Sequence, residues 1–248
     1  MAKLALTRNN MGWAAEKPNQ INQFFVDFCA TGVCDESSPA LDIGAAYGLA
    51  TIAALEAGAF VIANDLDPLH LDEIVRRTPE ASRHRLRLKP GRFPDQIHFE
   101  PETLGAIHAS NVFHFLTGNQ LSYGIRSAAR WLRPGGKLFV QAATPYQAQF
   151  AGFIPEYQRR LAAGVKWPGW VEKISRYSKH KKLGVMPASI HLLDDRTLVL
   201  LVEAAGFRVE RAWLYQREDF PNELKLDGRE SLGLVAVKNK ASIPTATI

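Results

Sequence analysis

The sequence has few cysteines and no long hydrophobic segment. The two cysteines, Cys29 and Cys34, are too few for a disulfide framework and do not have a zinc-ligand spacing. We therefore expect reduced thiols in a cytoplasmic protein, and no metal site. The most apolar stretch, residues 49–63, is interrupted by Glu56 and Gly58, so no run approaches the roughly 20 residues that a bilayer requires. These absences argue against a disulfide-stabilised domain, a zinc protein and a membrane protein.

The charge of the chain is moderate. Lys and Arg number 30 and Asp and Glu 25, which gives a formal net charge of +5. A charge of this size permits binding to nucleic acid or to an anionic ligand without requiring either. Hydrophobic residues make up 46% and charged residues 22%, as in ordinary globular proteins. A length of 248 residues suits one α/β domain with an added segment.

The most informative segment runs over residues 40–50 and is followed by an apolar strand that ends at Asp65. The pattern is strand, glycine-containing turn, helix and second strand, which is typical of a nucleotide-type cofactor site at the carboxyl edge of a parallel sheet. A dinucleotide-binding turn would have glycine at Ala46, and the carboxylate of Asp42 would repel a pyrophosphate. The turn therefore favours a cofactor with a ribose, an amino group and a sulfonium. S-adenosylmethionine is that molecule.

This segment resembles the first motif of the class I S-adenosylmethionine-dependent methyltransferases, D/E-x-G-x-G-x-G, with alanine in place of the middle glycine. Residues 106–116 resemble the family's fourth-strand motif, and residues 132–140 resemble its turn into the fifth strand. The resemblance implies an α/β, Rossmann-like methyltransferase sandwich with a mostly parallel seven-stranded sheet, whose last strand is antiparallel. The first motif reads Asp42-x-Gly44-x-Ala46-x-Gly48.

The resemblance also divides the chain. It covers residues 40–143 well and 190–237 loosely, and it leaves the ends and one internal segment uncovered. We expect the uncovered parts to determine which substrate is used. The expected division is an irregular N-terminal arm and helix at 1–39, a methyltransferase core at 40–144 and 191–238, a helical lid insert at 145–190, and a disordered tail at 239–248.

Cofactor contacts are implied at the turn and at the strand ends. Asp65 would accept hydrogen bonds from both ribose hydroxyls, and Asp42 would order the turn and interact with the methionyl amino end through water. For Asp42, the alternative is a carboxylate that only ties down the local turn; Asp67 is interpreted as the cap of a helix over 68–82. The full expected set is Asp42, Gly44, Ala45, Ala46, Gly48, Asp65, Leu66, Arg92, Phe93 and Asn111.

Two positions depart from the family pattern. Arg92 stands where many relatives have an aspartate that receives the adenine amino group, and Gly105 stands at a position that is frequently acidic. We therefore expect backbone amides, together with packing on Phe93 or Leu66, to hold the adenine.

Three residues are candidates for acid–base catalysis. His114 follows the fourth strand, where a neutral histidine would take a proton from a hydroxyl or amine. His191 and Tyr146 lie at the two ends of the insert. The alternative for His114 is a histidine bonded to nearby backbone. Methyl transfer also proceeds by alignment alone, so the reaction does not require a base.

The insert combines aromatic and basic residues. It fits a lid over an aromatic or anionic small-molecule acceptor better than a nucleic-acid platform, because its Trp pair lies apart from most of its basic residues. The sequence thus predicts methyl transfer to an oxygen or nitrogen of a small organic molecule. Two alternatives remain: a methyltransferase acting on RNA or another macromolecule, and a catalytically silent S-adenosylmethionine-binding protein.

Overall fold

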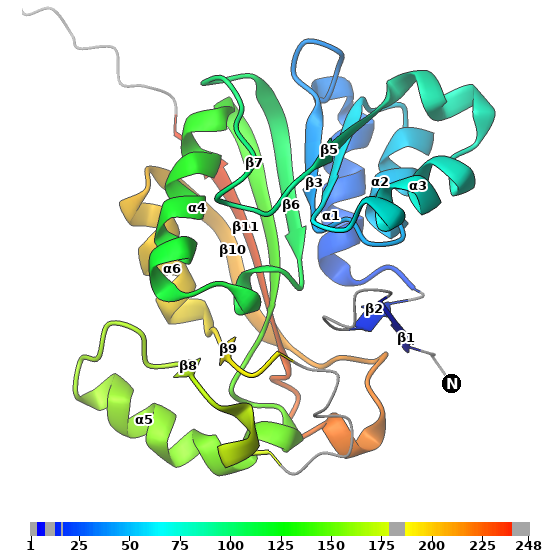
Figure 1. Ribbon diagram of the computed structural model, residues 1–248. Helices are drawn as coiled ribbons and strands as arrows, with labels where there is room; N and C mark the ends of the chain where they lie inside the picture. The colour runs from blue at the N-terminus through cyan, green and yellow to red at the C-terminus, as the bar shows by residue number, and fades with distance from the viewer. Residues whose placement is uncertain (1–3, 8–12, 16, 179–186, 240–248) are drawn as a thin grey trace, which may run out of the picture.

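The computed structural model describes residues 4–7, 13–15, 17–178 and 187–239, and its main feature is a seven-stranded sheet (Figure 1). The strand order is β10-β11-β7-β6-β3-β4-β5. Neighbouring strands from β7 to β5 pair in parallel, whereas β11 is antiparallel to both β7 and β10. The predicted sheet is therefore confirmed. The bounds are β3 Ala40–Ile43, β4 Val61–Asp65, β5 Leu86–Pro90, β6 Leu104–Ser110, β7 Leu132–Ala143, β10 Phe207–Tyr215 and β11 Ser231–Lys238.

Helices cover both faces of the sheet (Figure 1). Buried side chains of α1 and α2 pack with one set of strand residues, and those of α4 and α6 pack with the other set. None of the described helices is long and apolar enough to cross a membrane. The α-helices of the core are α1 Gln20–Phe28, α2 Leu49–Glu56, α3 Pro68–Arg77, α4 Gly118–Trp131 and α6 Asp195–Ala204; shorter helical segments are η1 Cys29–Val33, η2 Glu80–Arg85, η3 Phe113–Phe115 and η7 Asn222–Leu224.

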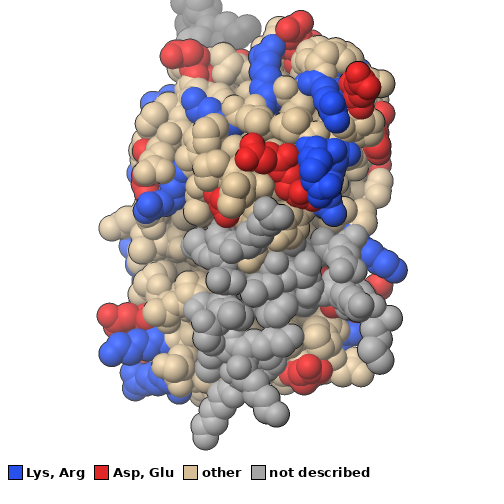
Figure 2. Space-filling view, turned by 45° about the vertical axis from the view of Figure 1, so that its right-hand side comes forward, with Lys and Arg blue, Asp and Glu red and all other residues tan. Residues whose placement is uncertain are grey.

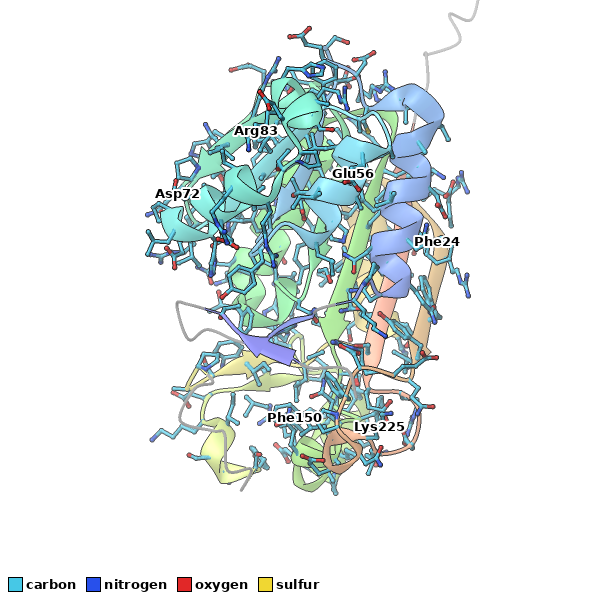
Figure 3. All side chains as sticks on the ribbon, turned by 90° about the vertical axis from the view of Figure 1, so that its right-hand side faces the viewer. Phe24, Glu56, Asp72, Arg83, Phe150 and Lys225 are labelled. Carbon is cyan, nitrogen blue, oxygen red and sulfur yellow. The ribbon has the colours of Figure 1, made fainter. Side chains whose placement is uncertain are left out.

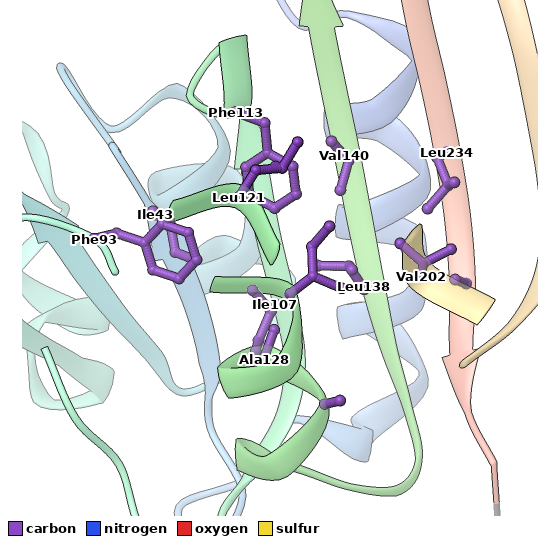
Figure 4. Close-up of a cluster of buried hydrophobic side chains, with 14 of the residues drawn as sticks. Ile43, Phe93, Ile107, Phe113, Leu121, Ala128, Leu138, Val140, Val202 and Leu234 are labelled. Atoms are coloured by element: carbon purple, nitrogen blue, oxygen red, sulfur yellow. The ribbon is translucent and has the colours of Figure 1, made fainter. Parts of the chain in front are cut away.

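Strand β3 shows how the sheet separates hydrophobic from polar side chains. Successive side chains of a strand point to opposite faces. Leu41 and Ile43 belong to the hydrophobic cluster beneath α4 and α6, part of which is drawn in Figure 4. Ala40 belongs to the cluster beneath α1 and α2, so Asp42 points to that same face. The sheet thereby directs one buried carboxylate towards the first helices.

The helix expected over 68–82 is shorter than the sequence indicated. It ends at Arg77, because Thr78 precedes Pro79 and adopts an extended ψ of 126°. Its start is as predicted: the side chain of Asp67 accepts a hydrogen bond from the amide of Leu69 at 3.0 Å. The carboxylate of Asp67 is therefore a helix cap.

The N-terminal arm is more regular than expected. Two short strands, β1 (Leu4–Leu6) and β2 (Trp13–Ala15), pair antiparallel within it. Neither has the length or the clear alternation that predicts a strand from sequence. The irregular arm was therefore a wrong prediction for these residues.

The insert has a small core of its own, below the sheet in Figure 1. Figure 3 labels one member of that core, Phe150, and also Phe24 of α1, which lies beside the sheet. The insert is not purely helical, because a strand pair accompanies its helix; this pair extends to His191 and crosses the expected boundary at residue 190. Residues 179–186, like 240–248 of the expected disordered tail, lie outside the described residues. The insert elements are η4 Ala148–Phe153, α5 Ile154–Ala162, β8 Trp170–Val171, η5 Ile174–Arg176 and β9 Ile190–His191.

Candidate cofactor and active site

The turn between β3 and α2 has the backbone that the sequence motif predicts. Gly44 and Gly48 have φ values of 65° and 79°, and Ala46 has a φ of 47° despite its side chain. The amide of Ala45 donates to the carbonyl of Asn64 at 2.8 Å, which fastens the turn to β4. A Cβ on Gly44 would lie 2.5 Å from Cγ2 of Val112. Glycine is therefore required there, because the loop after β6 lies against the turn.

Asp42 is buried and has a hydrogen-bond partner at each carboxylate oxygen. One carboxylate oxygen accepts from the hydroxyl of Thr51 at 2.6 Å, and the other contacts Nδ1 of His108 at 2.7 Å. The carboxylate thus joins β3 to the first turn of α2 and to β6. This geometry fits the indirect role expected for Asp42, which is to order the turn.

Asp65 ends β4 and is 5% exposed. Its Oδ1 contacts the amide of Asp67 at 2.9 Å and Nδ1 of His70 at 3.1 Å, and its Oδ2 accepts from the amide of Ala46 at 3.0 Å. Each carboxylate oxygen accepts about two hydrogen bonds. Oδ2 therefore has capacity for one ribose hydroxyl. Binding of both hydroxyls, as expected from the sequence, requires one of the existing contacts to be released.

The expected adenine residues divide into two groups. Leu66 is 47% exposed beside Asp65 and offers an apolar surface, and Arg92 is also exposed. Phe93 is a core residue, since it is 5% exposed and stacks on Phe113 with centroids 6.0 Å apart. Its burial argues against the adenine contact expected for it, and Leu66 is the better platform. An exposed apolar side chain next to a carboxylate matches the adenine ring and the ribose hydroxyls of an adenosine group.

Asn111 lies in a polar cluster at the carboxyl end of β6. Its φ is 62°, a conformation that asparagine tolerates, and its side-chain oxygen accepts from Nε2 of Gln141 at 3.0 Å. Arg217 contacts the same oxygen at 3.4 Å and is itself paired with Asp219 at 2.5 Å. Gln141 also donates to the hydroxyl of Ser110 at 3.3 Å. The cluster thus fixes Asn111, whose contact with the methionyl part stays a prediction.

His114 is poorly suited to act as a base. Nδ1 accepts a hydrogen bond from the backbone amide of Ala143 at 3.2 Å, so the proton of the neutral ring is on Nε2. Burial, and secondarily the charge of Arg217, lower the pKa of His114 to about 3. A group of this kind is a weak proton acceptor, and the structural alternative fits it better.

The other two catalytic candidates are also buried. Nδ1 of His191 contacts the carbonyl of Leu116 at 3.2 Å, and burial lowers the pKa of this histidine to about 4. Its ring contacts Trp167 and Trp170 edge-on, with centroids 5.4 and 5.9 Å away. Burial raises the pKa of the Tyr146 phenol, which the Arg229 guanidinium covers at 3.7 Å. Among the described residues, no hydrogen bond joins any two of these three candidates, so they do not form a catalytic dyad or triad with one another.

Sequence reasoning missed His108 and His70, two buried histidines that contact the expected cofactor ligands Asp42 and Asp65. It also missed Gln141 and Arg217 of the polar cluster around Asn111. A histidine within the apolar run Ala106–Ser110 was the available signal for His108. Within the described residues, no group of three or more His, Cys, Asp or Glu could hold a metal ion.

Residues 40–136 match the family model described as a methyltransferase domain. Residues 40–136 therefore form a methyltransferase domain, and the fold around it is that of S-adenosylmethionine-dependent methyltransferases. The buried acid and the missing pyrophosphate-binding glycine of the turn fit S-adenosylmethionine, the cofactor expected from the sequence. No curated protein sequence is significantly similar to this chain.

Solved structures share the fold of this chain at low sequence identity. An S-adenosylmethionine-dependent methyltransferase from Methanosarcina mazei is 15% identical, with 84% of this chain and 96% of that chain covered and a TM-score of 0.62. One from Mesorhizobium loti is 19% identical, with 84% and 95% covered and a TM-score of 0.58. The 1,6-didemethyltoxoflavin-N1-methyltransferase of Burkholderia thailandensis is 15% identical, with 89% and 79% covered and a TM-score of 0.57. At these identities the likeness shows the fold.

Proposed function

We propose that this methyltransferase acts on an oxygen or nitrogen of a small organic acceptor, which the insert at 145–190 and the N-terminal arm cover. The burial of four of the insert's seven aromatic side chains carries the proposal. Tyr146 is 9% exposed, Tyr157 is 1% exposed, and Phe150 and Phe153 are fully buried. Bases of a nucleic acid stack on exposed ring faces. Rings that are packed into a core are not available for stacking on bases, and this favours a lid over a nucleic-acid platform.

The basic residues of the insert support the same conclusion. Arg159 and Arg160 both bind Glu156, and Arg160 also donates to the carbonyls of Pro168 and Trp170. Cations with internal partners are less available to phosphates. On the face shown in Figure 2, the described basic side chains are interspersed with acidic ones. The basic residues at 179–182 lie outside the described residues.

A structural neighbour is consistent with a small acceptor. The Burkholderia thailandensis enzyme was solved with 1,6-didemethyltoxoflavin and S-adenosylhomocysteine bound, and it is named as an N1-methyltransferase. This methyltransferase shares only its fold, so the neighbour supports the class of acceptor and not its identity.

The proposed mechanism depends on alignment. S-adenosylmethionine supplies an electrophilic methyl group when bound. We assign Asp65 to the ribose, Asp42 and Asn111 to the methionyl end, and Leu66 to the adenine. The low pKa values of His114 and His191 leave these histidines neutral and weakly basic. Positioning the acceptor in line with the methyl group supplies effective molarities of ~10⁵ M or more, which is sufficient for catalysis without a strong base.

Two measurements test the proposal. Calorimetric titration with S-adenosylhomocysteine should give one site per chain. Transfer of a labelled methyl group from S-adenosylmethionine should then be screened over phenols and amines, each with and without a carboxylate, with total RNA as the competing substrate. Labelling of a small acceptor supports the proposal, whereas labelling of RNA alone, with an affinity that falls steeply with salt, would contradict it. Binding without any transfer would favour a silent cofactor-binding protein.

The cellular location is also a proposal. Cys29 and Cys34 are both free and buried, which supports the reducing, cytoplasmic environment expected from the sequence.

A further inference from the structure

Two buried histidines each contact one of the two cofactor acids. Nδ1 of His108 lies 2.7 Å from Asp42, and Nδ1 of His70 lies 3.1 Å from Asp65. The histidines are 2% and 1% exposed. We propose that His108 and His70 are positioning residues for the cofactor: His108 holds Asp42 for the methionyl end, and His70 holds Asp65 for the ribose. The inference rests on the proposed roles of the two acids.

The hydrogen-bond network around His108 fixes its proton. The side-chain oxygen of Asn22 accepts from the backbone amide of Asn19 at 2.8 Å, so the side-chain nitrogen of Asn22 faces His108. That nitrogen lies 3.3 Å from Nε2 of His108 and can only donate. Nε2 is therefore the acceptor, and the proton of the neutral ring is on Nδ1. His108 consequently donates to an ionised Asp42.

The sheet places His108 and Asp42 side by side. They are register partners in the parallel pair β3–β6 and point to the same face. Phe25 of α1 stacks on the imidazole with centroids 4.7 Å apart, which limits rotation of the ring. With Thr51 on its other oxygen, the buried carboxylate has a donor at each end. A buried charge is tolerated only when it is hydrogen-bonded in this way.

His70 plays the corresponding part for Asp65. An ionised carboxylate only accepts, so Nδ1 of His70 carries the shared proton. Tyr47 packs edge-on against the imidazole, with centroids 5.2 Å apart. The remaining donors to Asp65 that the structure describes are the backbone amides of Ala46 and Asp67, so His70 supplies the side-chain contact that sets the angle of the carboxylate.

The two histidines thus act on different parts of one ligand. His108 acts through Asp42 at the methionyl end, and His70 acts through Asp65 at the ribose. S-adenosylhomocysteine has both parts, whereas 5′-methylthioadenosine has the ribose but no amino acid. Comparing the affinities for these two ligands distinguishes the role of His108 from that of His70, and it distinguishes the role of His108 from a general loss of structure.

The variants compare donors at two positions. Asparagine places its amide nitrogen where Nδ1 lies, and glutamine places it near Nε2. We expect His108→Asn to keep the affinity for S-adenosylhomocysteine within about threefold and His108→Gln to weaken it about tenfold, because a charge-assisted hydrogen bond is lost. Neither variant should change the affinity for 5′-methylthioadenosine. His70→Gln should weaken binding of both ligands about tenfold, and His70→Asn should weaken neither.

Calorimetry on folded variants measures these differences, with thermal unfolding as the check on folding and His98→Gln, an exposed histidine, as the control. Equal affinities for the Asn and Gln variants would overturn the positioning roles. So would a His108→Gln variant that weakens both ligands equally, since that indicates a general structural effect. A wild-type protein that binds neither ligand would instead overturn the cofactor assignments of Asp42 and Asp65, and the positioning roles with them.

Discussion

The phenol of Tyr157 in the insert donates a hydrogen bond to the carboxylate of Asp194 at the start of α6. Both residues are buried, at 1% and 6% exposure. The other oxygen of Asp194 accepts from the amide of Thr197 at 2.8 Å and thereby caps the helix. Burial, followed by the bond to Asp194, raises the pKa of the Tyr157 phenol and keeps it protonated as a donor. One carboxylate thus joins the insert to the core.

Tyr157→Phe should lower the free energy of unfolding by about 1–3 kcal/mol, because the buried carboxylate loses a donor while the ring packing is retained. Urea unfolding measures the change. Tyr123→Phe is the matched control, since Tyr123 is 39% exposed. Equal stabilities for Tyr157→Phe and the wild type would show that the hydrogen bond does not anchor the insert.

Asp65→Ala should weaken S-adenosylhomocysteine binding by about tenfold or more, because the ribose loses a charged acceptor. Asp67→Ala is the control two residues away: it removes a helix cap and should cost about 1 kcal/mol of stability without changing affinity. Calorimetry and thermal unfolding of both variants separate the roles. A loss of affinity in Asp67→Ala alone would reverse the assignment.

Gly44→Ala should lower both stability and cofactor affinity. Its φ of 65° is unfavourable for alanine, and the new Cβ would lie 2.5 Å from Val112, so we expect a loss of about 2 kcal/mol or more. Gly58→Ala shares the positive φ, but its Cβ would meet nothing within 4 Å, so it should cost about 1 kcal/mol and leave affinity unchanged. Adding Val112→Ala to Gly44→Ala should recover part of the stability. No recovery would argue that the contact is unimportant.

Stability should fall as the pH is lowered below about 6.5, the ordinary pKa of histidine. Burial lowers the pKa of His114 to about 3 and of His191 to about 4. Between these values and 6.5 the unfolded chain binds more protons, so the free energy of unfolding rises with pH, by at most about 1.4 kcal/mol per unit for each histidine. His191→Asn, which cannot titrate, should reduce the slope in a series of urea unfolding curves. An unchanged slope in His191→Asn would contradict the assignment of the pH dependence to this histidine. The control His98→Gln should have the wild-type slope.

The sequence predicted the parts of the fold that local pattern determines. The apolar strands β3 and β4, the turn glycines Gly44 and Gly48 and the cap Asp67 each follow from neighbouring residues. Helix α3 was predicted to run to about Ser82 but ends at Arg77, because Pro79 restricts the residue before it.

The site was harder to predict, because its contacts join distant parts of the chain. His108 and Asp42 are 66 positions apart, and Gln141 and Asn111 are 30 apart. Periodicity indicates which face of a strand a residue occupies, but it does not identify the cross-strand neighbour. His114 illustrates the same limit: its position after β6 suggested catalysis, whereas its burial and its bond to Ala143 depend on the packed structure.

The position of β11 in the sheet has a consequence for synthesis of the chain. This strand, residues 231–238, lies between β7 and β10 and pairs with β7 over seven register positions, from Ser231–Ala143 to Val237–Lys137. During translation β7 emerges long before its partner, so its edge stays open while about 90 further residues are added, a non-local pairing of the kind that folds slowly. The sheet that supports the cofactor turn is completed only after residue 238 has left the ribosome.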